Sequence, residues 1–171
     1  VYKRQQQELE IRSIRVAELE LMINKKDSIV TNLKQTISRA LKGLDGQGLT
    51  IIQKQGKVYI SMEEELLFAS GRYKINSGGI IALNKLAAVL GKQNSLQILV
   101  EGHTDSIPFN GKGEIKDNWD LSVMRATSVV KVLLKNPMLS PLHLSAAGRA
   151  EFLPIAPNST SDGRDAKRRI D

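Results

Sequence analysis

The first quarter of the chain has an apolar residue at every seventh position. These positions are Tyr2, Leu9, Val16, Ile23, Val30, Ile37 and Leu44, and no Gly or Pro interrupts the sequence before Gly43. A heptad repeat of this length predicts a long helix with one coiled-coil seam. Half of the companion positions three residues further on are polar or charged, so the seam is imperfect.

A seam of this kind buries little surface alone and needs a partner helix. We favour a parallel homodimer through residues 2–44 over packing on the chain's own globular part, because the pattern is much longer than an ordinary helix of about 12 residues. The glycines at 43, 46 and 48 predict the end of the helix. The chain is therefore expected to divide into a spacer, residues 1–45, and a domain, residues 46–171.

After Gly48, predicted strands and helices alternate. Strands are predicted at 49–53, 57–62, 95–101, 142–147 and 168–171, and the last is expected to continue beyond residue 171. Helices are predicted at 78–92 with Ser77 as cap, from Asp117 or Asn118 to about 135, and at 161–167. This order predicts an α/β fold: a two-layer sandwich with a mixed sheet and a βαβαβ core, preceded by the long helix.

The charge, the aromatic content and the absence of cysteine limit the kinds of partner and chemistry that the chain can have. The net charge is +7, but the 25 basic residues are dispersed and aromatic residues make up only 4%, so we expect no nucleic-acid partner. The sequence has no Cys, which excludes disulfides and thiolate chemistry. No apolar run approaches the roughly 20 residues that cross a bilayer. Any membrane attachment is expected through a segment upstream of Val1.

Polar residues follow the predicted strand that ends near residue 101. Glu101, His103 and Asp105 could be metal ligands or an acid and base pair, but the only other histidine in the sequence, His143, belongs to a separate strand. We therefore expect no metal and no cofactor, and we expect His103 to be a partly buried imidazole bonded to backbone. The sequence also lacks a Gly-x-Ser-x-Gly nucleophile elbow.

Several short motifs occur in a fixed order along the chain. They are Gly102-His-Thr-Asp105, Asn118-Trp-Asp-Leu-Ser122, Arg125-Ala126, Gly148, Pro154, Gly163-Arg164 and Arg168-Arg169. This ordered set resembles the OmpA-like (OmpA/MotB C-terminal) peptidoglycan-binding domain over roughly residues 58–171. The long loop that begins at Ser106 is similar to that of the MotB-type subgroup, which also includes non-flagellar envelope proteins.

The resemblance implies a module that binds peptidoglycan without catalysis, through the diaminopimelate of the stem peptide. Asp105 matches the aspartate expected to receive the ammonium of diaminopimelate, and Arg125 matches the arginine expected to pair with its carboxylate. A guanidinium suits this task because its planar fork can bond both carboxylate oxygens. We expect the two side chains to lie together at an open cleft mouth. Side chains that point apart or are sealed from water would contradict this hypothesis.

Further positions match residues that line the family's cleft: Thr104, Asn118, Leu121 and Arg168. Asn118 is equally well interpreted as a helix cap and Leu121 as a core residue. Phe68 to Gly71 occupies a region where many relatives have Phe-Asp, but here Ala69 replaces the Asp. Any contact there is expected from Ser70 or from backbone amides such as that of Gly71. Lys167 replaces a usual Asn before the paired arginines.

The implied role is a cell-wall anchor for an envelope protein or assembly, on the periplasmic face and associated with the outer membrane. The alternative is a stator-like, MotB-type component of a flagellar motor that also anchors to the wall. A wall hydrolase is a third hypothesis, with Glu101 and Asp105 as the two carboxylates. It is disfavoured because Arg125 would depress the pKa of a carboxyl group that must stay protonated.

Overall fold

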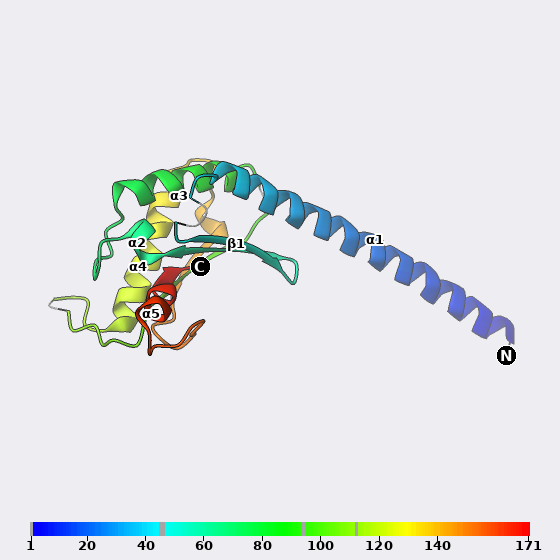
Figure 1. Ribbon diagram of the computed structural model, residues 1–171. Helices are drawn as coiled ribbons and strands as arrows, with labels where there is room; N and C mark the ends of the chain where they lie inside the picture. Colours follow the sequence, from blue (N-terminus) through cyan, green and yellow to red (C-terminus); the bar gives the residue numbers. More distant parts are fainter. Residues whose placement is uncertain (1, 45–46, 94, 112) are drawn as a thin grey trace.

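The computed structural model describes residues 2–44, 47–93, 95–111 and 113–171. Gly46, one of the glycines predicted to end the first helix, lies outside these ranges, as do Val1 and the predicted spacer boundary. Figure 1 shows a globular part from which one long helix projects. That helix, α1, runs from Tyr2 to Ala40 and ends before Gly43, whose φ of 98° is in the left-handed region.

Five strands form one mixed sheet in the order β1-β2-β5-β3-β4. β1 (Leu49–Lys54) and β2 (Lys57–Glu63) form the predicted hairpin, with Leu49 opposite Met62. β5 (Arg169–Ile170) lies antiparallel between β2 and β3 (Ile98–His103), and β3 runs parallel to β4 (Leu144–Gly148). The structure thus confirms the predicted α/β fold with a mixed sheet.

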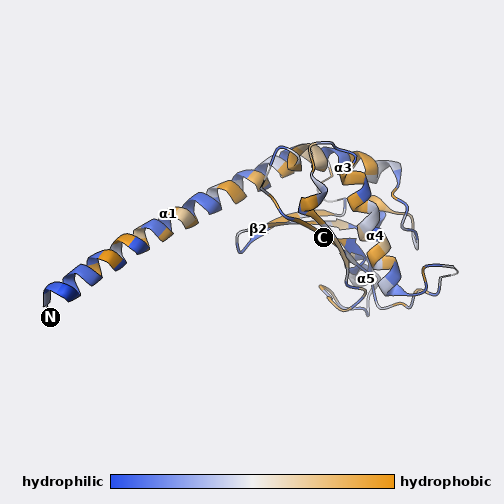
Figure 2. Cartoon of the chain, turned by 180° about the vertical axis from the view of Figure 1, so that it is seen from behind, coloured by the Kyte–Doolittle hydropathy of each residue, from blue (hydrophilic) through white to orange (hydrophobic). Residues whose placement is uncertain are grey.

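The helices pack on one face of this sheet. They are the short α2 (Glu64–Leu67), α3 (Ser77–Leu90), α4 (Asn118–Leu133) and the last turns of α1, while α5 (Ser161–Lys167) precedes β5. Alternate sheet residues such as Met62, Val100 and Ile170 are buried beneath the helices. Residues on the opposite face, including Ile52, Tyr59 and Leu99, are exposed, so the sandwich has two layers. Figure 2 shows apolar stretches in the sheet and in α3 and α4, and alternating apolar and polar stretches along α1.

Some predicted element ends are wrong. Asn76, not Ser77, caps α3, because its side chain accepts a hydrogen bond from the Gly79 amide. Leu142 and His143 form a 3-10 turn, Pro141–His143, before β4 begins. β3 begins at Ile98 and reaches His103, where it pairs with Arg169. Arg169, the partner of His103, lies 66 residues further along the chain, so the local sequence pattern could not predict where β3 ends.

The last turns of α1 belong to the core of the globular part. Ile37 and Leu41 are buried among residues of α3 and the sheet, and Leu33 and Leu44 pack against the same core. Packing on the chain's own domain, the less favoured alternative, therefore accounts for the C-terminal part of the seam, which includes Ile37 and Leu44. From Tyr2 to Ile29 the apolar residues of α1 are exposed. None of the helices in the described ranges is long and apolar enough to cross a membrane.

The ends of β3 and β4 both approach α4 very closely. A Cβ added at Gly102 would lie 2.0 Å from the Ser122 carbonyl oxygen, and one added at Gly148 would lie 2.4 Å from the Ser122 hydroxyl. Both contacts are shorter than any real Cβ contact, so glycine is required at both positions. The close packing fixes α4 over the end of β3, where the motif residues lie.

Candidate functional site

Acidic and basic side chains form a cluster beyond the end of β3. Asp105 follows β3, Arg125 lies in α4, and Arg168 lies between α5 and β5. Glu64, the first residue of α2, reaches the same place from the end of β2. Four separate segments therefore bring their charges together, and three carboxylates (Glu64, Asp105 and Asp165) are bonded to two guanidinium groups.

Asp105 is held by Arg168. Arg168 Nη1 donates to Asp105 Oδ2 at 2.6 Å, and the Ile107 amide donates to Asp105 Oδ1 at 3.0 Å. Arg168 also pairs with Asp165 on the more exposed side of the cluster. Burial alone would lower the pKa of Arg168, but the hydrogen bond to Asp105 and the charges of Glu64 and Asp165 outweigh it and raise the pKa.

Arg125 is held by Glu64. Its Nη2 donates to Glu64 Oε1, its Nε donates to the Arg72 carbonyl at 2.9 Å, and its guanidinium carbon lies 5.1 Å from the centre of the Phe68 ring. Desolvation outweighs the attraction of Glu64 and lowers the pKa of Arg125. The group remains a guanidinium at any physiological pH because its ordinary pKa is so high.

Glu64 also links the two halves of the cluster. Arg168 Nε lies 2.7 Å from Glu64 Oε2, although this buried oxygen accepts no hydrogen bond of good geometry from a described residue. The charges therefore alternate along one chain of contacts, from Asp105 through Arg168 and Glu64 to Arg125. Asp105 and Arg125 share the cluster but make no direct ion pair in the described structure.

The cluster is closed to solvent in this structure. Arg125 is 2% exposed and Asp105 is 5% exposed, while the Arg168 side chain, at 28%, forms the outer side. The expectation of an open cleft mouth is therefore wrong, and the sealed pair meets the condition given above as contradicting it. The physical reason is that Arg168 and Glu64 already satisfy the two charges that the motif supplies. Ligand binding at this cluster requires its ion pairs to open.

Of the other predicted site residues, Thr104 and Asn118 support the loop of Asp105, whereas Leu121 belongs to the buried core. Thr104 Oγ1 donates to the Asp105 carbonyl at 3.0 Å, and Asn118 Nδ2 donates to the Asp105 and Ile107 carbonyls at 3.3 and 3.0 Å. Asp117, not Asn118, is the N-cap of α4.

The segment after Phe68 contributes through its backbone. The Gly71 amide donates to Glu64 Oε1 at 3.3 Å, while Ser70 is exposed and Gly71 has a φ of 66°. Lys167 is buried and makes no ion pair with a carboxylate of the described residues. The contact from this segment to the cluster is thus the Gly71 amide.

Glu64 was not predicted as a site residue, although the sequence carries a signal for it. Val58, Ile60 and Met62 of β2 face the helices, and Glu64 continues this alternation by one step. The run Glu63-Glu64-Glu65 resembles an ordinary solvated charge cluster, so the sequence alone does not distinguish the buried Glu64 from its two neighbours. Asp165 was missed because its role depends on Arg168, its partner three residues later.

The three residues considered as metal ligands do not converge. The Glu101 carboxylate accepts from Arg149 Nε at 2.7 Å, Asp105 pairs with Arg168, and the buried His103 Nε2 lies 3.3 Å from Asp171 Oδ2. Neither His103 nitrogen makes a well-formed hydrogen bond with a described group, so the expected bond to backbone is wrong. Across the described ranges, no group of three His, Cys, Asp or Glu residues could hold a metal ion.

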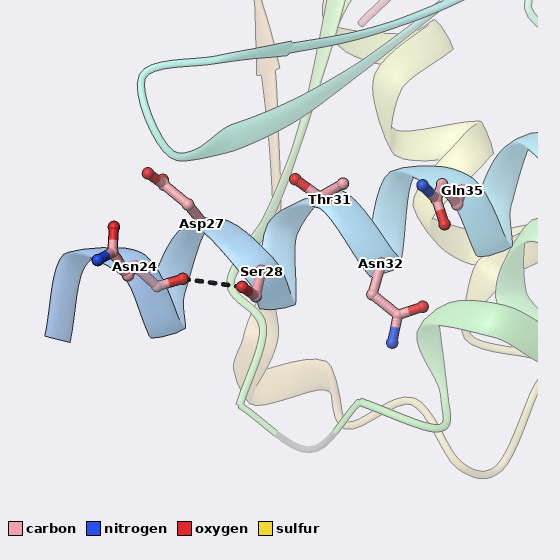
Figure 3. Close-up of a pocket in the computed structure, with 6 residues that line it drawn as sticks. All are labelled: Asn24, Asp27, Ser28, Thr31, Asn32 and Gln35. Carbon is pink, nitrogen blue, oxygen red and sulfur yellow. Dashed lines mark hydrogen bonds between the residues drawn. The ribbon is translucent and has the colours of Figure 1, made fainter. Parts of the chain in front are cut away.

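A shallow hollow on α1 is a second place where polar side chains gather. Figure 3 shows its lining residues, Asn24, Asp27, Ser28, Thr31, Asn32 and Gln35, all on one helix beside the β1–β2 hairpin. Thr31 Oγ1 donates to Gln53 Oε1 of β1 at 3.3 Å, and Ser28 donates to the Asn24 carbonyl at 2.9 Å. The hollow marks the point where α1 leaves the globular part and brings no opposite charges together.

Comparison with known proteins identifies relatives of this chain. The sequence model of the OmpA family matches residues 67–168. Motility protein B of Bacillus subtilis (strain 168) is 31% identical over 142 residues, which are 82% of this chain and 54% of that protein. The chain thus spans about half the length of the curated relatives it matches.

Solved structures share the fold. A putative MotB like protein from Desulfovibrio vulgaris superposes with a TM-score of 0.78 at 23% identity, covering 88% of this chain and 94% of that chain. The cell wall anchor of the T6SS from Pseudomonas aeruginosa superposes with a TM-score of 0.69 at 26% identity, covering 78% and 92%.

Proposed function

The chain belongs to the OmpA family, and we propose that its globular part binds peptidoglycan without catalysis and so anchors an envelope protein or assembly to the cell wall. The observation that carries this proposal is the alternating cluster of Asp105, Arg168, Glu64 and Arg125. A cluster of alternating charges is complementary to a ligand that carries an ammonium and a carboxylate on one carbon. Diaminopimelate of the stem peptide has such a head group.

Binding proceeds by exchange of ion-pair partners. The ammonium of the ligand takes the place of Arg168 at Asp105, and its carboxylate takes the place of Glu64 at Arg125. Arg168 and Glu64 are already paired with each other, so they can remain paired after they move away. The exchange leaves no buried charge without a partner, which would otherwise cost several kcal/mol.

Selectivity comes from Arg125. Its Nε is fixed by the Arg72 carbonyl and its face by Phe68, so the guanidinium has a set orientation. A stem peptide with lysine in place of diaminopimelate has the ammonium but lacks the carboxylate. Such a ligand would leave Arg125 paired with Glu64 and would gain only the contact with Asp105.

The exposed part of α1 separates the globular part from its point of attachment and provides a surface for self-association. From Tyr2 to Ile29 α1 presents an exposed apolar seam, and we propose that this part carries the parallel homodimer expected through residues 2–44. At about 1.5 Å per residue it spans roughly 40 Å. In Figure 1, α1 leaves the globular part on the side away from α5 and the first turn of α4. This arrangement suits a protein on the periplasmic face that is attached to the outer membrane through an upstream segment.

The second candidate function is a stator-like component of a flagellar motor. It is favoured by the likeness to Motility protein B over 82% of this chain. Both candidates use the same wall contact and differ in what lies upstream of residue 1. A membrane helix with an embedded acidic residue would favour the stator, whereas a lipid attachment site would favour the outer-membrane tether.

Cosedimentation with purified sacculi tests the proposed function. Asp105→Asn and Arg125→Lys preserve side-chain size and folding better than alanine, and each should reduce the bound fraction at least tenfold. Arg149→Ala, which removes an exposed ion pair with Glu101, is the matched control and should sediment like the wild type. Wild-type sedimentation by both site variants would refute the proposed site.

A further inference from the structure

Two aromatic side chains are stacked in solvent beside the charge cluster. Trp119, in the first turn of α4, and Phe152, after β4, have ring centres 5.5 Å apart and planes inclined by 25°. Trp119 is 48% exposed and Phe152 is 65% exposed. An exposed pair of stacked aromatic rings offers a surface on which the apolar face of a ligand can pack.

The segment that carries Phe152 is rigidly attached. The Ala150 carbonyl accepts from the Thr104 amide at 2.9 Å, and the Ala150 amide donates to Ser122 Oγ at 3.2 Å. Ala150 itself has a φ of 46°, an unfavourable conformation for a residue with a Cβ. Bonds to Thr104, just after β3, and to Ser122 of α4 thus hold a strained turn two residues before Phe152 and fix where its backbone lies.

The aromatic pair adjoins the proposed diaminopimelate site. Asn118, the neighbour of Trp119, donates to the Asp105 carbonyl, and it also donates to Glu151 Oε2 at 3.4 Å, beside Phe152. In peptidoglycan, diaminopimelate is the third residue of a stem joined to a sugar, and three extended residues span about 10 Å. A bound stem peptide would therefore bring a sugar ring within reach of the pair.

We propose that Trp119 and Phe152 form a second subsite, which binds a sugar ring of the glycan strand; this inference rests on the proposed function. One face of a pyranose ring presents C–H groups, which pack favourably on the electron-rich face of an aromatic ring. Glu114 and Asp120 line a small hollow beside Trp119, which Phe152 does not line. One Asp120 oxygen accepts from the Lys116 amide at 2.8 Å, and the remaining carboxylate oxygens can accept hydrogen bonds from sugar hydroxyls. The same carboxylates disfavour a nucleic acid, whose phosphates they would repel.

Three probes separate the sugar subsite from the peptide site: a disaccharide-tripeptide, the free diaminopimelate tripeptide, and a peptide-free glycan oligomer. Trp119 is the sole tryptophan of the sequence, so its fluorescence reports directly on the proposed subsite. We expect the disaccharide-tripeptide to bind the wild type about three- to tenfold more tightly than the tripeptide, and the glycan oligomer to shift the Trp119 emission.

Phe152→Ala should abolish this difference and leave the tripeptide affinity unchanged, whereas Phe152→Tyr should retain it. Trp119→Ala, followed by calorimetry, should behave like Phe152→Ala. Leu142→Ala removes an exposed apolar side chain elsewhere and is the control. Equal affinity of the wild type for both peptides without a glycan-induced shift would overturn the subsite. Failure of the tripeptide to bind, with a glycan shift retained, would instead overturn the diaminopimelate site alone.

Discussion

Arg125 is a charged side chain almost without contact with water, and Glu64 is the counter-ion that compensates it. Removing one partner of a buried ion pair costs more than the pair contributes, because the remaining charge stays desolvated. Glu64→Gln should therefore lower the free energy of unfolding by about 3 kcal/mol. Urea titration measures this change.

The exposed pair of Arg149 and Glu101 provides the comparison for that experiment. Arg149→Ala should cost less than about 1 kcal/mol, since the Arg149 side chain is largely solvated. Equal stability of Glu64→Gln and wild type would show that Arg125 does not depend on this counter-ion.

Asp171 makes the stability depend on pH. Burial alone would raise its pKa, but contacts with His103 and Ser61 and the charge of Arg169 outweigh burial and lower it. A lowered pKa in the folded state stabilises the protein above the ordinary carboxyl pKa, and this contribution is lost as pH falls through the lowered value.

Asp171→Asn should therefore be less stable than wild type by roughly 1 kcal/mol at pH 7. The difference should begin to shrink as pH falls below the ordinary carboxyl pKa of about 4, and it should disappear only below the lowered pKa of the folded state, where the wild-type carboxyl is protonated as well. Thermal unfolding of both proteins in a pH series from 7 to about 2 measures it. A difference that is the same at every pH would contradict the assignment.

At the scale of elements, the seam of α1 has two parts with different roles. Ile37 and Ile23 lie two heptads apart on the same stripe, but Ile37 is buried in the core and Ile23 is exposed. Ile37→Ala should lower the free energy of unfolding by about 2 to 4 kcal/mol, because it leaves a cavity. Ile23→Ala, the matched control, should leave the unfolding of the globular part unchanged; equal losses would refute the division.

The elements themselves could be predicted because their signals are local. The hairpin, α4 and the short α5 follow from patterns within a few residues of each end, although the sequence left the cap of α4 open between Asp117 and Asn118. The packing of Ile37 and the end of β3 could not be predicted, since both depend on partners far along the chain. The ordered motifs indicated Asp105, Arg125 and Arg168, but the inward position of Glu64 and the resulting closure depend on tertiary contacts.

At the scale of the whole molecule, the exposed part of α1 predicts self-association. The wild-type chain should sediment as a dimer at micromolar concentration, and Val16→Asp combined with Ile23→Asp should convert it to a folded monomer, because charges in a seam oppose its burial. Sedimentation velocity measures both states. A wild-type chain that remains monomeric at high concentration would contradict the dimer.

The central claim is that the closed charge cluster binds the cell wall by exchanging its ion-pair partners, while α1 connects this cluster to the rest of the protein. It is tested most directly by calorimetric titration of the whole chain with a diaminopimelate tripeptide and with the matching lysine tripeptide. The account predicts at least tenfold tighter binding of the diaminopimelate peptide, with the preference lost in Arg125→Lys. Equal affinities of the wild type for the two peptides would contradict it.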